Sequence, residues 1–104
     1  MSRRLTDEEI ERQLESLPDW TRKGETITAS LEAPNFLAAI DMVREAADEA
    51  EGMYHHPDID IRWRTTKWLL TTHDEDGLTQ LDIELAHRIS DIARRHGAKP
   101  AGEE

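Results

Sequence analysis

The feature that most constrains the fold is a long helical pattern set between two β-prone stretches. Apolar residues recur every three or four positions across 36–50, which predicts an amphipathic helix that opens at Pro34-Asn35. We expect this stripe to belong to the core rather than to a cofactor site. Gly52 should loosen or end the helix, and Pro57 cannot continue it. The stripe residues are Phe36, Ala39, Ile40, Val43, Ala46, Ala47 and Ala50.

Strand periodicity flanks this helix on both sides. Apolar and polar residues alternate over 25–31, after a turn signal at Gly24, and a weaker strand precedes that turn. After the helix, residues 58–65 alternate again, and 67–73 are rich in Thr, Trp and Leu. Each side therefore predicts a β-hairpin. We expect Trp63 to be a strand residue with a packing role.

Capping patterns mark two further helices. Thr6-Asp7-Glu8-Glu9 reads as a capping box, and Pro18 should end the helix that it begins. Thr79-Gln80-Leu81-Asp82 is a variant with Asp in place of Glu, and Gly97 suits the stop. A capping role accounts for Asp82, which we assign as structural. Residues 98–104 should form a loose tail. The apolar stripe of the last helix comprises Leu78, Leu85, Ile89, Ile92 and Ala93.

The element order is therefore α-β-β-α-β-β-α. This order predicts an α+β fold with a four-stranded antiparallel sheet and three helices on one face. The other face would be more polar and free for a ligand or partner. A chain of 104 residues suits one domain over 1–104, with an ordered core of about 6–97.

Charge and cysteine content exclude several classes of function. The chain has 13 basic and 23 acidic residues, a formal net charge of −10, which argues against nucleic acid and anionic membranes as partners. The absence of cysteine excludes disulfides, thiolate catalysis and Cys-ligated zinc. No apolar run approaches the roughly 20 residues of a membrane span, and the start lacks a signal core. We expect a cytoplasmic protein.

Histidine is the residue type best suited to proton transfer near neutral pH. His55 and His56 lie between the central helix and the third strand, and His73 ends the fourth. If those strands pair, three imidazoles meet at one rim of the sheet. The alternatives are an exposed polar pair and a three-histidine zinc site, although adjacent residues in an extended segment point opposite ways. His87 and His96, in the last helix, are expected to lie at the surface or to pack at its boundary with the core.

The three histidines belong to a longer pattern, Glu51-x3-His55-His56-Pro57-x5-Trp63-x9-His73-x8-Asp82, with seven fixed positions over 32 residues. The pattern resembles the signature of the pterin-4a-carbinolamine dehydratases, and the likeness extends over roughly 6–95. One position departs from it. Many members carry an aromatic residue, usually Trp, two positions after the proline, where this chain has Ile59. The difference concerns packing around the pterin rather than proton chemistry.

The resemblance implies a hydro-lyase that removes water from 4a-hydroxytetrahydropterin to give quinonoid dihydropterin, which recycles the pterin cofactor of aromatic amino acid hydroxylases. The leaving hydroxyl needs an acid and N5 needs a base, so three imidazoles suffice without a metal or bound cofactor. The implied catalytic residues are His55, His56 and His73, with His56 as the principal base. The implied substrate-binding residues are Glu51, Pro57, Thr72, Asp74 and Glu75, of which Glu51 also supports an imidazole.

The expected partners are the small pterin substrate and further copies of the chain, as a homodimer or homotetramer, because open sheet edges favour pairing. The alternative function is that of a non-catalytic dimerisation or assembly partner with the same fold. Animal relatives double as a dimerisation cofactor of a transcription factor. Inactive relatives are expected to lack one of the histidines, and this chain keeps all three.

Overall fold

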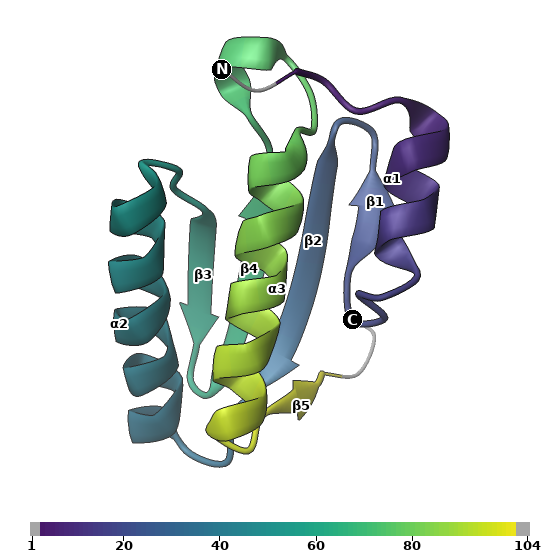
Figure 1. Cartoon of the computed structure of the whole chain (residues 1–104). Helices are drawn as coiled ribbons and strands as arrows, with labels where there is room; N and C mark the ends of the chain where they lie inside the picture. The colour runs from purple at the N-terminus through teal and green to yellow at the C-terminus, as the bar shows by residue number, and fades with distance from the viewer. Residues whose placement is uncertain (1–2, 102–104) are drawn as a thin grey trace.

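The computed structural model describes residues 3–101 and combines three α-helices with one antiparallel sheet (Figure 1). The predicted α+β class and the predicted order of the main elements are confirmed. A short 3₁₀ helix, η1, and a fifth strand, β5, were not predicted. The elements are α1 (Asp7–Leu14), β1 (Thr21–Lys23), β2 (Thr26–Glu32), α2 (Phe36–Met53), β3 (Asp58–Arg62), β4 (Thr65–Leu70), η1 (His73–Glu75), α3 (Gln80–Arg95) and β5 (Lys99–Pro100).

The sheet follows the order β1-β2-β4-β3, and all its pairings are antiparallel. Both predicted hairpins are present, and β2 joins them through a six-residue register with β4 that runs from Ile27↔Leu70 to Glu32↔Thr65. The expectation of a loose tail from residue 98 is wrong in part. Lys99 and Pro100 pair with β2, and the Ala101 N–H donates to the Ser30 carbonyl at 2.9 Å. Residues 102–104 lie outside the described chain.

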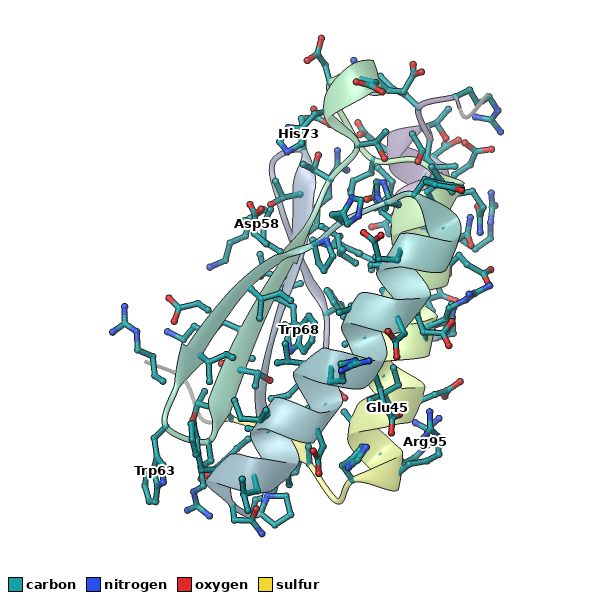
Figure 2. All side chains as sticks on the ribbon, turned by 90° about the vertical axis from the view of Figure 1, so that its left-hand side faces the viewer. Glu45, Asp58, Trp63, Trp68, His73 and Arg95 are labelled. Atoms are coloured by element: carbon teal, nitrogen blue, oxygen red, sulfur yellow. The ribbon has the colours of Figure 1, made fainter. Side chains whose placement is uncertain are left out.

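The three helices cover one face of the sheet, as predicted (Figure 1). Alternate residues of β2 and β4 point into the layer between sheet and helices and are buried, while their neighbours face the other side. Figure 2 shows Trp68 between the sheet and α2. The buried apolar residues are Ile10, Leu17, Trp20, Ile27, Ala29, Leu31, Ala33, Ala39, Met42, Ala46, Ala50, Trp68, Leu70, Leu78, Ile83, Leu85, Ala86, Ile89, Ile92 and Ala93.

Both predicted capping boxes are present. The Glu9 N–H donates to Thr6 Oγ1 at 3.1 Å, and the Thr6 N–H donates to Glu9 Oε1 at 2.9 Å. At the start of α3 the Thr79 N–H donates to Asp82 Oδ2 at 2.9 Å, and Thr79 Oγ1 accepts from the Leu81 N–H at 3.2 Å. Side-chain hydrogen bonds from Arg3, together with the Thr6 N–H, lower the pKa of Glu9 to about 2. The first box is exposed, whereas Asp82 in the second is fully buried.

The apolar stripe of α2 is rotated by part of a turn from its predicted position. Ala39, Ala46 and Ala50 are buried as expected, but Phe36 and Ile40 are 47% and 38% exposed. Met42, which was not assigned to the stripe, is buried in their place. Small alanines and the long methionine side chain therefore form the contact with the sheet, and the bulkier residues near the start of α2 face outward.

Two further local predictions are wrong. Trp63 is not a packed strand residue: it occupies the β3–β4 turn in the left-handed conformation, with φ of 56°, and is 71% exposed. The Arg64 guanidinium lies 4.8 Å from its ring centroid, in cation–π contact. Gly52 does not end α2. The helix continues to Met53, and Tyr54 caps it in the left-handed conformation.

An ionic cluster joins the middle of α2 to the C-terminal end of α3 (Figure 2). Glu45 of α2 lies 3.0 Å from His96 Nε2 and 3.0 Å from an Arg95 guanidinium nitrogen. Hydrogen bonds from His96 and then Arg95 lower the pKa of Glu45. His87 is exposed on α3, in agreement with the prediction, and His96 is partly buried by its contact with Glu45.

The helix-free face of the sheet is hollowed. The hollow has a volume of about 760 Å³ and mixes charged side chains, such as Lys67 and Asp60, with apolar ones. Ile59, which replaces the expected aromatic residue, lines it and is 36% exposed beside Trp68 of β4. Over residues 3–101, no helix is long and apolar enough to span a membrane.

Candidate active site

The antiparallel pairing of β3 and β4 brings the two histidine-bearing segments to one end of the sheet. Asp58, the first residue of β3, pairs with Leu69 near the end of β4. The chain therefore enters β3 through His55-His56-Pro57 at the same end where it leaves β4 toward His73. Figure 2 shows Asp58 and His73 at this end of the molecule, while Trp63 lies at the other.

The end of α2 turns the two adjacent histidines toward different helices. Tyr54 adopts φ of 52° and ψ of 40°, which ends the helix, and the His55 N–H donates back to the Ala50 carbonyl at 3.1 Å. After this turn the His55 side chain contacts α3 and the His56 side chain contacts α2. One tight turn thus separates two neighbouring imidazoles into two different surroundings.

His55 is buried, with 8% of its surface exposed, and forms a pair with a carboxylate. Its Nε2 lies 2.5 Å from Oδ1 of Asp82, which is fully buried. Asp82 belongs to the first turn of α3, 27 positions further along the chain. A buried carboxylate is costly unless hydrogen-bonded and paired, and this one is both.

The other oxygen of Asp82 accepts two hydrogen bonds. The Thr79 N–H donates to Oδ2 at 2.9 Å as part of the capping box, and the Thr72 hydroxyl donates at 2.7 Å. The predicted capping role is confirmed, but the contact with His55 was missed. Local spacing explained Asp82 completely, and the one signal for more was its fixed position in the histidine pattern.

His56 pairs with the predicted carboxylate, Glu51. Its Nε2 lies 2.5 Å from Glu51 Oε2, across the last turn of α2. The side chains of His56 and Glu51 are 61% and 75% exposed. The support of an imidazole by Glu51, which the resemblance implied, therefore corresponds to a contact at the surface, open to solvent.

His73 opens η1 and is exposed, three residues beyond the end of β4. The preceding Thr72 is buried and forms an isolated bridge with Gly77, which closes the loop that carries Asp74 and Glu75. Asp74 is exposed and Glu75 is partly buried. Through its contact with Asp82, Thr72 links this loop to His55, so the two predicted segments share one buried network.

The end of the sheet thus holds all eight predicted site residues, with Pro57 partly buried between His56 and β3. None of the eight lines the hollow on the helix-free face, which reaches this region only at Asp58 and Ile59. Within the described part of the chain, no group of three or more His, Asp or Glu side chains is arranged to hold a metal ion. The chemistry that these residues offer is proton transfer by imidazoles.

Comparisons with known proteins agree on one family. Residues 3–92 match the family model described as pterin 4 alpha carbinolamine dehydratase. A protein of Nocardia farcinica is 51% identical over 90 residues, covering 86% of this chain and 95% of its own length. One of Mycobacterium tuberculosis is 48% identical over 85 residues, covering 82% and 90%. Both carry the name "Putative pterin-4-alpha-carbinolamine dehydratase".

A solved structure from Brucella melitensis, described as a transcriptional coactivator/pterin dehydratase, is similar in fold. It aligns with a TM-score of 0.84 and 35% sequence identity, over 86% of this chain and 98% of that one. The family match spans most of the chain, and the relatives are covered almost completely. The chain belongs to the pterin-4a-carbinolamine dehydratase family, whose members are hydro-lyases.

Proposed function

We propose that the protein is a 4a-hydroxytetrahydropterin dehydratase that works by histidine acid–base catalysis. In the reaction the C4a–O bond breaks, the hydroxyl leaves as water, and N5 loses a proton as the C4a=N5 bond forms. The product is quinonoid dihydropterin, and the pterin cofactor of aromatic amino acid hydroxylases is thereby recycled. The proposal keeps the expectation of a cytoplasmic enzyme that needs no bound metal or cofactor.

The observation that carries the proposal is that two segments, 55–57 and 72–75, meet at one end of the sheet. They bring three imidazoles and two histidine–carboxylate pairs to that end. A dehydration that needs both a proton donor and a proton acceptor is suited to several imidazoles, and each positioned transfer contributes about 10²–10⁴-fold.

The roles of the three histidines follow those that the family resemblance implies. His56, exposed and paired with Glu51, is assigned as the base that removes the N5 proton. His55 and His73 are assigned to the hydroxyl side, where the C4a–O bond breaks. The remaining substrate contacts are assigned to Glu51, Pro57, Thr72, Asp74 and Glu75.

A stopped-flow assay of 4a-carbinolamine breakdown tests the proposal. Wild type should accelerate the reaction well above buffer, and His56→Ala and His73→Ala should each lose about 10²–10⁴-fold. His87→Ala is the matched control, because His87 is an exposed histidine of α3 outside the site, and it should keep the full rate. The proposal would be contradicted by a wild-type protein no faster than buffer, or by a control variant that loses as much rate as His56→Ala.

A second candidate function, a dimerisation or assembly partner, is favoured by the description of the Brucella structure as a transcriptional coactivator. Exposed apolar side chains near the start of α2, Phe36, Leu37 and Ile40, offer surface for such a contact. On either function we expect a homodimer or homotetramer, because β3 is an open sheet edge. Sedimentation of the intact chain checks this, and a strictly monomeric result would contradict it.

A further inference from the structure

In two of the three hydrogen bonds that Asp82 makes, its carboxylate is the acceptor. A backbone N–H can only donate, so the contact from Thr79 N makes Oδ2 an acceptor. The Thr72 hydroxyl also donates to Oδ2, at 2.7 Å. Two donors on one oxygen are what an ionised carboxylate accommodates, since each of its oxygens has two lone pairs.

The two threonine hydroxyls provide no donor for the other oxygen of Asp82, Oδ1. The single proton of Thr72 goes to Oδ2, so in the 2.8 Å contact between the two hydroxyls Thr79 donates to Thr72. Thr79 Oγ1 in turn accepts from the Leu81 N–H at 3.2 Å. Every hydroxyl proton of this buried network is therefore used, and Oδ1 receives nothing from it.

The one polar contact that the described residues give Oδ1 is His55 Nε2, at 2.5 Å. Asp82 is fully buried, and a buried carboxylate oxygen without a donor is costly. We propose that Asp82 is a positioning residue that holds His55 as the Nε2–H tautomer, so that Nδ1 is the nitrogen that exchanges protons with the substrate.

This inference deepens the proposed function, on which its catalytic part rests. With a proton also on Nδ1, His55 is a cation whose charge the carboxylate at 2.5 Å offsets inside the protein. His55 can then pass the Nδ1 proton to the 4a-hydroxyl as the C4a–O bond breaks, which releases water, while His56 takes the N5 proton. His55 returns to the neutral Nε2–H form, and Asp82 stays ionised throughout.

The tautomer can be read directly by ¹⁵N NMR on the labelled wild-type protein. Protonated and bare imidazole nitrogens have well separated shifts, and the spectrum of His55→Gln identifies which signals belong to His55. We expect a protonated Nε2 across neutral pH. A neutral ring protonated at Nδ1 instead would overturn the inference, and this measurement needs no variant of Asp82 to fold.

Asp82→Asn makes the same test by substitution. The amide carbonyl still accepts from Thr79 N and the Thr72 hydroxyl, but its NH₂ faces His55 Nε2 and must donate there. We expect His55 to switch to the Nδ1–H tautomer and the dehydration rate to fall about 10²–10⁴-fold. A folded Asp82→Asn protein that keeps the Nε2–H signal, or the wild-type rate, would overturn the inference.

Glu9→Gln is the matched control, because it removes the carboxylate of the other capping box, which contacts no histidine. It should leave both the His55 spectrum and the rate unchanged. A loss of rate equal to that of Asp82→Asn would make the effect one of capping and overturn the inference. Failure of the proposed function is distinguishable, since it shows as a wild type without dehydratase activity whatever the tautomer.

Discussion

Two histidine–carboxylate pairs on consecutive histidines have the same length and opposite surroundings. His55–Asp82 and His56–Glu51 both measure 2.5 Å, yet the first is buried between β4, α3 and the end of α2, and the second faces solvent. A salt bridge at the surface contributes little, because water and ions already stabilise both partners. A buried carboxylate has no such substitute, so removal of one partner leaves the other uncompensated. Burial, and not distance, therefore separates a pair on which the stability of the fold depends from one whose loss the solvent can compensate.

The largest expected effect is the loss of stability on removal of the buried carboxylate. Asp82→Ala should cost about 3–5 kcal/mol, because it leaves His55, Thr72 and the Thr79 N–H without their partner. Glu51→Ala, at a pair of the same length, should cost less than about 1 kcal/mol. Chemical denaturation of both variants beside wild type measures the difference. Equal losses would show that burial does not distinguish the two pairs.

A smaller loss of stability is expected when Asp82 loses one of its hydrogen-bond donors. Thr72→Val removes one donor to the ionised Asp82 and should cost about 1.5–3 kcal/mol, the range for hydrogen bonds to charged groups. Thr71→Val is the neighbouring control, since the Thr71 hydroxyl donates to the neutral Glu25 carbonyl at 2.6 Å. It should cost about 0.5–1.5 kcal/mol. Denaturation curves that rank the two variants in the reverse order would contradict a charged Asp82.

Salt should act on the exposed pair alone. The Debye length falls from about 10 Å at 0.1 M to about 3 Å at 1 M salt, which screens charges in contact with water. The stability difference between wild type and Glu51→Gln should therefore shrink toward zero at 1 M sodium chloride. The corresponding difference for Asp82→Asn should persist. Urea denaturation at the two salt concentrations checks this, and a loss of both differences would argue against a dry His55–Asp82 contact.

The smallest expected effect is a pH dependence of stability that arises from Glu9 in the first capping box. The pKa of Glu9 is lowered to about 2, chiefly by Arg3 and then by the Thr6 N–H. A carboxyl whose folded pKa lies below its unfolded value of about 4.3 stabilises the fold above that value. This contribution is lost as pH falls toward 2. Wild type should be more stable than Glu9→Gln at pH 6, and the difference should vanish near pH 2.

A double-mutant cycle with Arg3→Gln identifies the cause of that pH dependence. Arg3 approaches Glu9 Oε2 at 2.8 Å, so its removal should shift the loss of stability toward a higher pH. Denaturation of the four proteins between pH 2 and pH 6 measures the coupling. A pH profile that Arg3→Gln leaves unchanged would assign the whole effect to the capping hydrogen bond.

The parts of the fold that sequence predicted are those set by short-range chemistry. Thr6 and Thr79 begin helices because their hydroxyls accept backbone N–H bonds within three residues, and both boxes formed as read. The alternation in β2 predicted its buried face, because successive residues of a strand point to opposite sides of the sheet. The contact between Glu51 and a histidine was implied by the family resemblance and not by local spacing, which suited a solvated glutamate at a helix end equally well.

The errors arose where tertiary packing overrides local pattern. Trp63 continues an alternating run. The turn between β3 and β4 contains no glycine, so Trp63 itself takes the left-handed position. In α2, spacing alone did not distinguish a stripe through Ile40 from one through Met42, because alanines are common to both. The contact between His55 and Asp82 joins residues 27 apart and depends on how α3 packs beside α2.

The left-handed Tyr54 has one more consequence, for how the family can diverge. It fixes the phase at which the chain leaves α2, and therefore which of the two histidines enters the interior. Inserting a single residue between Tyr54 and His55 would turn each histidine to the opposite side, whereas lengthening the loop after His73 would leave both in place. Insertions and deletions should therefore be absent between positions 54 and 57 of natural relatives.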